Sequence, residues 1–169
     1  MLIHPSSFAS KRFAPNHFLN IIGNPLDTTT GVHHLIFGGV LERFPDLKFV
    51  LSHGGAFATH YFARMDHAYG ARPDCRATIH QKPSVYLKKF YVDGLVFSIE
   101  QLDYLIKLFG VDHVLIGTDY PFDMGEYDPV EHVYQAHDLS EGDREKICGL
   151  NALRLLKRDP ADFTHRVAV

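Results

Sequence analysis

The sequence lacks tryptophan altogether and contains only two cysteines, Cys75 and Cys148, in 169 residues. Two cysteines are too few for a disulfide framework, and neither stands in a CxxC pair. A disulfide scaffold and a cysteine-based zinc site are therefore both excluded. We expect both thiols to be reduced, as in a cytoplasmic protein.

Positive charge and long apolar runs are also scarce. The chain has 17 lysines and arginines against 20 aspartates and glutamates, a balance that argues against nucleic acid as a partner. No run approaches the ~18 apolar residues that a membrane span needs, and the first residues lack the basic segment of a signal peptide. The sequence therefore predicts a cytoplasmic, globular protein without a membrane partner.

Histidine, by contrast, is abundant: there are twelve, in a chain that is 46% apolar. Because histidine is the commonest metal ligand and exchanges protons near neutral pH, this count indicates a metal or acid–base site. The length suits one domain, yet it falls well short of the ~250 residues of a complete (β/α)8 barrel.

Short apolar runs alternate with longer amphipathic segments along the chain. The runs are apolar on both faces, as expected for strands of a parallel sheet that is covered on both sides. Between them apolar residues recur at helical spacing, and one helix is marked by Ser98 as N-cap, Gln101 as its capping-box partner and Gly110 as its stop. We predict an α/β fold with strands at 1–4, 48–53, 90–93 and 113–119 and helices at 30–44, 57–69, 98–109, 129–137 and 140–157.

Each predicted strand ends in a histidine or an aspartate, namely His4, His53, Asp93 and Asp119. In parallel α/β sheets and barrels, binding and catalytic side chains gather at the carboxyl ends of the strands. We therefore expect a shared site, in which imidazoles and a carboxylate would bind a divalent ion such as Zn²⁺ and another imidazole would act as acid or base. Taken singly, each histidine has a plainer interpretation as a hydrogen-bonded core or loop residue. Asp93 would equally cap a turn at Gly94 or orient a neighbouring histidine.

Two arginines, Arg64 and Arg72, follow His53 in the segment ARMDHAYGAR. A guanidinium group binds carboxylates through two parallel hydrogen bonds, so two arginines near a metal would suit a substrate with carboxylate groups. The residue pattern alone favours the simpler alternative, in which they lie on the outer face of a helix and pair with Asp66 or Asp74.

Four segments, ERFPDLKFVLSHGG, RMDHAYGAR, LIGTDYPF and GLNALRLL, resemble the carboxyl-terminal half of the amidohydrolase-related decarboxylases. This family includes the aminocarboxymuconate-semialdehyde, resorcylate and dihydroxybenzoate decarboxylases. The resemblance implies a distorted (β/α)8 barrel with one divalent metal ion, usually zinc, and no organic cofactor. It also implies that His4 and Asp119 bind the metal and that His53 is the acid–base residue. Arg64 and Arg72 stand where the family binds substrate carboxylates, one of them across a dimer interface.

The activity implied by the resemblance is the non-oxidative decarboxylation of a small unsaturated or aromatic carboxylic acid. Related members hydrolyse lactones or C–N bonds with the same residues, so a metal-dependent hydrolase is an alternative. A catalytically inactive half-barrel, kept as an interaction module, is another.

The sequence departs from the family in one respect, because no H-x-H pair occurs anywhere in it. In the family this pair, on the first strand, supplies two further ligands. His4 and Asp119 alone are fewer than the three protein ligands of catalytic zinc sites. We predict that residues 1–169 form a single partial barrel domain, the last four βα units. The chain would be a fragment of a longer protein, or it would pair with a separate amino-terminal half or with a second copy as a homodimer. We expect the chain alone to bind metal weakly and to have little activity.

Overall fold

The computed structural model describes residues 1–6, 11–13 and 15–163, and the chain divides into two compact units, Met1–Asp93 and Gly94–Val169. Four strands in the order β1-β2-β3-β4 are separated by helices. The prediction of four parallel strands alternating with helices is confirmed. Among the described residues, no helix combines the length and the apolar character required to cross a membrane.

The first unit contains three parallel strands, and their register brings the residues after β1 beside those after β2. β1 (Leu2–Ile3) pairs with β2 (Val50–Leu51) so that Ile3 faces Leu51, and β2 pairs with β3 (Tyr91–Asp93) so that Leu51 faces Val92. Leu51 and Val92 are completely buried, as expected for strands covered on both faces. Since parallel strands in register end at the same edge, the residues that follow β1 and β2 are neighbours.

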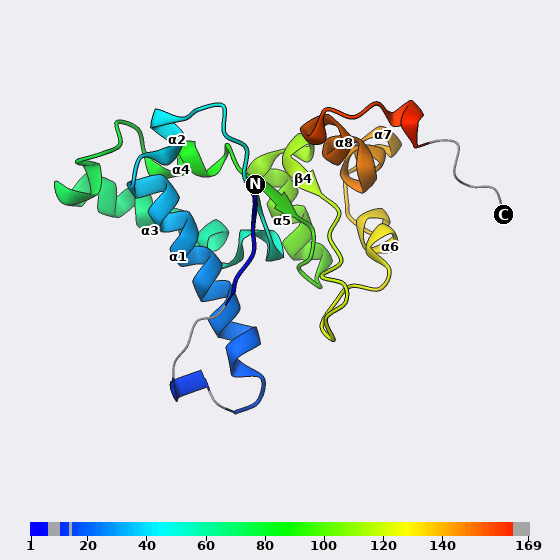
Figure 1. Ribbon diagram of the computed structural model, residues 1–169, viewed down its shortest axis with the longest axis horizontal. Coiled ribbons are helices and arrows are strands. Elements are labelled where there is room, and N and C mark those ends of the chain that lie inside the picture. Colours follow the sequence, from blue (N-terminus) through cyan, green and yellow to red (C-terminus); the bar gives the residue numbers. More distant parts are fainter. Residues whose placement is uncertain (7–10, 14, 164–169) are drawn as a thin grey trace. The chain divides into compact units, whose positions relative to one another are not determined.

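Helices connect these strands. α1 (Asn24–Phe37) and α2 (Val40–Arg43) lie between β1 and β2, and α3 (Ala56–Ala71) and α4 (Pro83–Leu87) lie between β2 and β3. Figure 1 shows α1 and α3 packed side by side. The predicted single helix at 30–44 is wrong in its bounds, because Gly39 adopts a left-handed conformation with φ of 69° and separates α1 from α2.

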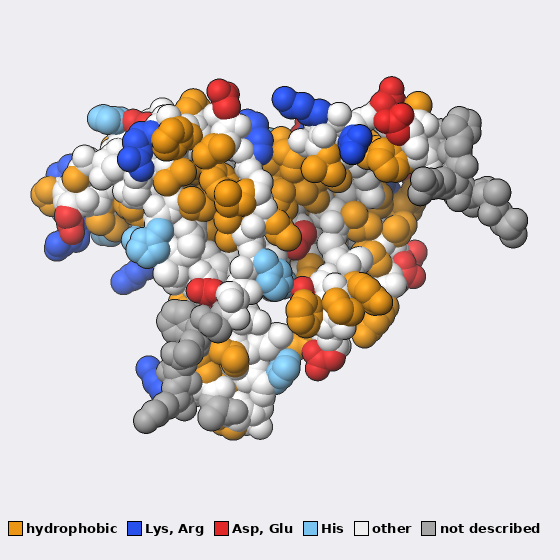
Figure 2. All heavy atoms as spheres, in the orientation of Figure 1, with side chains coloured by type: hydrophobic (Ala, Val, Ile, Leu, Met, Phe, Trp, Pro, Cys, Tyr) orange, Lys and Arg blue, Asp and Glu red, His pale blue; other side chains and the backbone are white. Residues whose placement is uncertain are grey.

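Exposed apolar side chains lie on β1 and after α2. Met1 is 78% exposed and Leu2 62% exposed, and Phe44 and Leu47 are also exposed. Figure 2 shows hydrophobic side chains near the amino-terminal strand. β1 is thus an edge strand of the sheet that leaves apolar side chains exposed.

The second unit contains β4 (Val114–Leu115) with α5 (Ile99–Phe109), α6 (Pro129–Tyr134), α7 (Glu141–Glu145) and α8 (Asn151–Leu156). Ser98 caps α5 as predicted, because its side chain accepts the N–H of Gln101 and Gly110 ends the helix. The predicted helix at 140–157 is divided, since a wider π-helical turn at Lys146–Leu150 separates α7 from α8. Ser140 and Asp143 form a capping box at the start of α7.

Glu42 of α2 accepts hydrogen bonds that connect α2 to α4 and to the loop before α4. Its carboxylate receives hydrogen bonds from the Tyr86 hydroxyl and from the ring and backbone of His80. The bond from Tyr86, followed by those from His80, lowers the pKa of Glu42 from an ordinary value of 4.5 to about 2.

This contact predicts a loss of stability in acid. The folded pKa of Glu42 is depressed, so its contribution is present above about pH 4.5 and is lost as the pH falls towards about 2. Glu42→Gln should lower the thermal unfolding midpoint at pH 6 and make it less sensitive to pH between 4.5 and 2. Glu145→Gln, at an exposed site on α7, is the control. Equal acid sensitivity of Glu42→Gln and the wild type would contradict the role of this carboxylate.

Candidate active site

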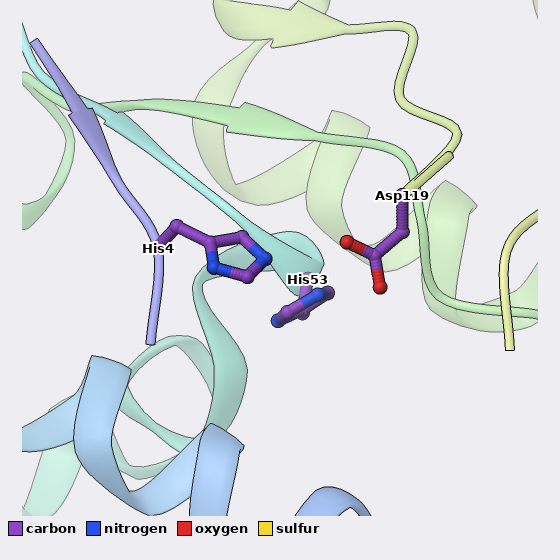
Figure 3. Close-up of side chains that lie close together, drawn as sticks. All are labelled: His4, His53 and Asp119. Atoms are coloured by element: carbon purple, nitrogen blue, oxygen red, sulfur yellow. The ribbon is translucent and has the colours of Figure 1, made fainter. Parts of the chain in front are cut away.

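Two histidines meet at the carboxyl ends of neighbouring strands. His4 directly follows β1, and His53 follows β2 after one intervening residue, Ser52. Figure 3 shows the two imidazoles beside each other; their ring centroids are 5.2 Å apart, with the planes at 62°. Within the first unit, the structure therefore brings together two of the residues that the sequence placed at strand ends.

Ser52 fixes the spacing between these histidines. Its backbone N–H and its hydroxyl both donate to the carbonyl of Ile3, at 3.1 and 3.0 Å, and the residue is only 3% exposed. The residue that follows Ile3 is His4, whose Nδ1 lies 2.9 Å from the carbonyl of Pro5. A carbonyl only accepts, so Nδ1 is the protonated nitrogen in this bond and Nε2 is the atom suited to bind a metal.

His53 opens a left-handed turn of the backbone. The φ angles of His53, Gly54, Gly55 and Ala56 are 55°, 60°, 74° and 55°. A Cβ atom on Gly55 would lie 2.7 Å from the Cγ2 atom of Thr59, so only glycine fits there. The turn runs directly into α3 and presents the half-buried His53 at the end of β2.

Two side chains from other elements hold this turn and the start of α3. Asp93, the last residue of β3, accepts the Gly54 N–H at 2.9 Å. Thr29 of α1 accepts the Phe57 N–H at 3.1 Å. The sequence allowed Asp93 to cap a turn at Gly94, and the structure shows it capping the turn at Gly54 instead, 39 residues away. Its alternative role, orienting a neighbouring histidine, stays a prediction.

Asp119 belongs to the second unit, four residues beyond β4, and is also labelled in Figure 3. It is half-buried and has a positive φ of 55°. Its backbone carbonyl accepts the Phe122 N–H at 3.0 Å, while the Thr118 carbonyl accepts the Glu126 N–H at 2.8 Å. The loop after Asp119 is thus closed by its own backbone hydrogen bonds, which restricts the position of the carboxylate.

The two arginines lie away from the turn. Arg72 follows the last turn of α3, and its Nε and Nη2 atoms lie 3.1 and 3.3 Å from the two carboxylate oxygens of Asp74. This pair is exposed, and its hydrogen bonds raise the pKa of Arg72 and lower that of Asp74. The alternative pairing of Arg72 with Asp74 is confirmed, whereas Asp66 accepts the N–H and hydroxyl of Ser84 at 2.9 and 2.7 Å.

Arg64 is exposed on α3. It stands eight residues after Ala56, which corresponds to about 12 Å along the helix at 1.5 Å per residue. Neither arginine is therefore brought to His53 within this unit, and their predicted contact with a substrate carboxylate stays a prediction.

Ser52 and Thr29 are residues that the sequence analysis missed. Ser52 had a usable signal, because a lone hydroxyl at the end of the apolar run KFVLSH needs a hydrogen-bond partner once it is buried. Thr29 had none, since its partner Phe57 lies 28 residues away on another helix.

Comparison with known proteins places this chain among relatives of similar fold. The family described as amidohydrolase matches residues 1–158. The chain is 38% identical over 165 residues to the 2-amino-3-carboxymuconate-6-semialdehyde decarboxylase of Dictyostelium discoideum, a match that covers 96% of this chain and 46% of that protein. It spans about half the length of the relatives that it matches.

Solved structures of decarboxylases also resemble the chain. The 5-carboxyvanillate decarboxylase of Sphingomonas paucimobilis matches with a TM-score of 0.79 and 28% identity, over 94% of this chain and 49% of that one. A dihydroxybenzoic acid decarboxylase from Polaromonas, solved with bound manganese and an inhibitor, matches with a TM-score of 0.73 and 23% identity, over 92% of this chain and 49% of that one. These likenesses confirm the predicted fold class, four βα units of a (β/α)8 barrel.

Proposed function

The chain belongs to the amidohydrolase family, and from that premise we propose that it provides half of a metal-dependent, non-oxidative decarboxylase. The substrate would be a small unsaturated or aromatic carboxylic acid. The observation that carries the proposal is the pair of imidazoles, His4 and His53, at adjacent strand ends of a chain whose relatives are decarboxylases.

His4, His53 and Asp119 are residues of the types that could hold a metal ion. We propose that His4 and Asp119 bind one divalent ion and that His53 serves as the acid–base group. Nitrogen and carboxylate ligands suit zinc, and the Polaromonas relative carries manganese, so both ions belong in the test. A bound ion would stabilise the negative charge that develops on the substrate as carbon dioxide leaves.

His53 supplies the proton. As the bond between the substrate carbon and its carboxylate breaks, the electron pair remains on that carbon, and the protonated imidazole donates a proton to it. The neutral imidazole then takes up a proton from solvent for the next turnover. An imidazole can both donate and accept a proton, so one side chain can perform both halves of this cycle.

This chain offers too few metal ligands, and its two arginines are not brought to His53 within the first unit. A second chain or segment would therefore complete the site. The sequence contains no H-x-H pair, and two ligands are fewer than the three of catalytic zinc sites. We propose that an amino-terminal half supplies the missing ligands and that Arg64 and Arg72 bind substrate carboxylates, one of them in the partner subunit of a homodimer. The distance of Arg64 along α3 from the His53 turn supports a role in another subunit.

Fragment complementation tests this function. The 169-residue chain would be purified alone and with the complementary amino-terminal half of the Dictyostelium relative, each with zinc or manganese. Release of carbon dioxide from 2-amino-3-carboxymuconate-6-semialdehyde and from 2,6-dihydroxybenzoate would be measured, together with bound metal. We expect weak metal binding and little turnover for the chain alone, and turnover on complementation.

The outcomes separate the competing functions. Robust turnover with near-stoichiometric zinc in the isolated chain would contradict the need for a second half. Ring opening without carbon dioxide, from lactone or cyclic amide substrates, would favour the hydrolase alternative. A folded, metal-loaded complex that releases no carbon dioxide would contradict the decarboxylase.

A further inference from the structure

Asp93 reaches the backbone of the turn that presents His53. The parallel pairing of β2 with β3 sets Leu51 opposite Val92, so the next residue of β3 lies beside the end of β2. From there Asp93 accepts the Gly54 N–H at 2.9 Å. Gly54 is buried, and a buried N–H requires an acceptor. The hydrogen bond therefore ties the residue after His53 to the neighbouring strand.

The strained backbone of this turn requires stabilising contacts from other elements. His53 and Ala56 both adopt positive φ angles of 55°, a conformation in which their Cβ atoms crowd the backbone. Such conformations persist where the surroundings impose them, and they cluster at functional sites. Asp93 acts at Gly54, between the two strained residues, while Thr29 acts beyond them at Phe57.

We propose that Asp93 is a positioning residue for His53. By accepting the Gly54 N–H, it holds His53 in the left-handed conformation that sets its imidazole beside that of His4. It does so through the backbone, so what matters is its oxygen acceptor rather than its negative charge. The inference rests on the proposed function for the role of His53, and its tests use readouts that do not require turnover.

Two substitutions separate the acceptor from the charge. Asp93→Asn keeps an oxygen that can accept the Gly54 N–H and removes the charge, whereas Asp93→Ala removes both. Asp66→Ala is the matched control, because Asp66 likewise accepts a backbone N–H at 2.9 Å in the same unit, at the start of α4. Amide hydrogen exchange at Gly54 and the ring resonances of His53 would be measured by NMR in the full 169-residue chain.

We expect Asp93→Ala to speed exchange at Gly54 by about tenfold or more, the effect of losing one hydrogen bond, and to shift the His53 ring resonances. Asp93→Asn should keep the exchange rate of Gly54 within about threefold of the wild type and leave the His53 ring resonances in place, and Asp66→Ala should leave Gly54 and His53 unchanged. If Asp93→Ala does not fold, Asp93→Asn still tests the proposal, because its amide oxygen must keep the Gly54 N–H protected from hydrogen exchange.

Asp93→Asn behaving like Asp93→Ala would overturn the proposal, since the charge would then be the essential property. Unchanged Gly54 exchange in a folded Asp93→Ala chain would overturn it as well. Absence of carbon dioxide release from the complemented, metal-loaded enzyme, with Gly54 and His53 responding as expected, would contradict the proposed function and support the positioning role.

Discussion

Replacing His53 with alanine is expected to lower the rate of decarboxylation by about 10²- to 10⁴-fold, the usual contribution of a general acid–base group. The enzyme is the chain complemented with an amino-terminal half and loaded with metal. His53 is assigned to proton transfer rather than to metal binding, so bound metal should remain close to the wild-type amount. Rates of carbon dioxide release and metal content per chain are the measurements.

Two further variants make this result specific. His67→Ala removes an exposed histidine of α3 and should leave the rate unchanged. Asp119→Ala removes a proposed ligand and should lower metal content and activity together. A His53→Ala enzyme within about threefold of wild-type activity would contradict the acid–base assignment, and parallel loss of metal and activity in it would identify His53 as a ligand instead.

Asn151→Ala is expected to destabilise the second unit by about 2–4 kcal/mol, because it leaves one buried and one partly buried backbone carbonyl without their donor. The side chain is 1% exposed, and its Nδ2 donates to the carbonyls of Val111 and Val114, each at 2.8 Å. It thereby fastens α8 to the 3-10 turn that precedes β4 and to the first residue of β4, the strand that leads to Asp119.

Urea unfolding followed by circular dichroism measures this loss, since the chain has no tryptophan for fluorescence. Gln135→Ala is the matched control, as it removes an exposed amide at the end of α6 that donates to Glu131, and it should cost less than about 0.5 kcal/mol. A cost below about 1 kcal/mol for Asn151→Ala would show that the two carbonyls find other donors.

The strands and the helix caps were predictable because their signals are local. The four apolar runs and the cap at Ser98 were all found where the sequence placed them, and the strands are shorter than their apolar runs. The helix bounds were less predictable. α1 begins at Asn24 rather than near residue 30, with Pro25 in its first turn. The left-handed Gly39 interrupts the helix that the apolar spacing had predicted to be continuous.

The arginines show that a residue pattern alone does not predict which charged side chains form pairs. Arg72 and Asp74 are two residues apart, so their ion pair was within reach of sequence reasoning. The partner of Asp66 was not, because Ser84 lies 18 residues away at the start of another helix. Which carboxylate a surface arginine meets depends on the path of the chain between them.

By itself the sequence determined the alternation of strands and helices and the histidine or aspartate at each strand end, because hydrophobic periodicity and caps act over a few residues. Only the tertiary structure decided that His4 and His53 face each other and that Asp93 caps the Gly54 turn. These contacts join residues 49 and 39 positions apart in the sequence. They follow from the register of the parallel strands, which is set by packing across the whole unit rather than by any local pattern.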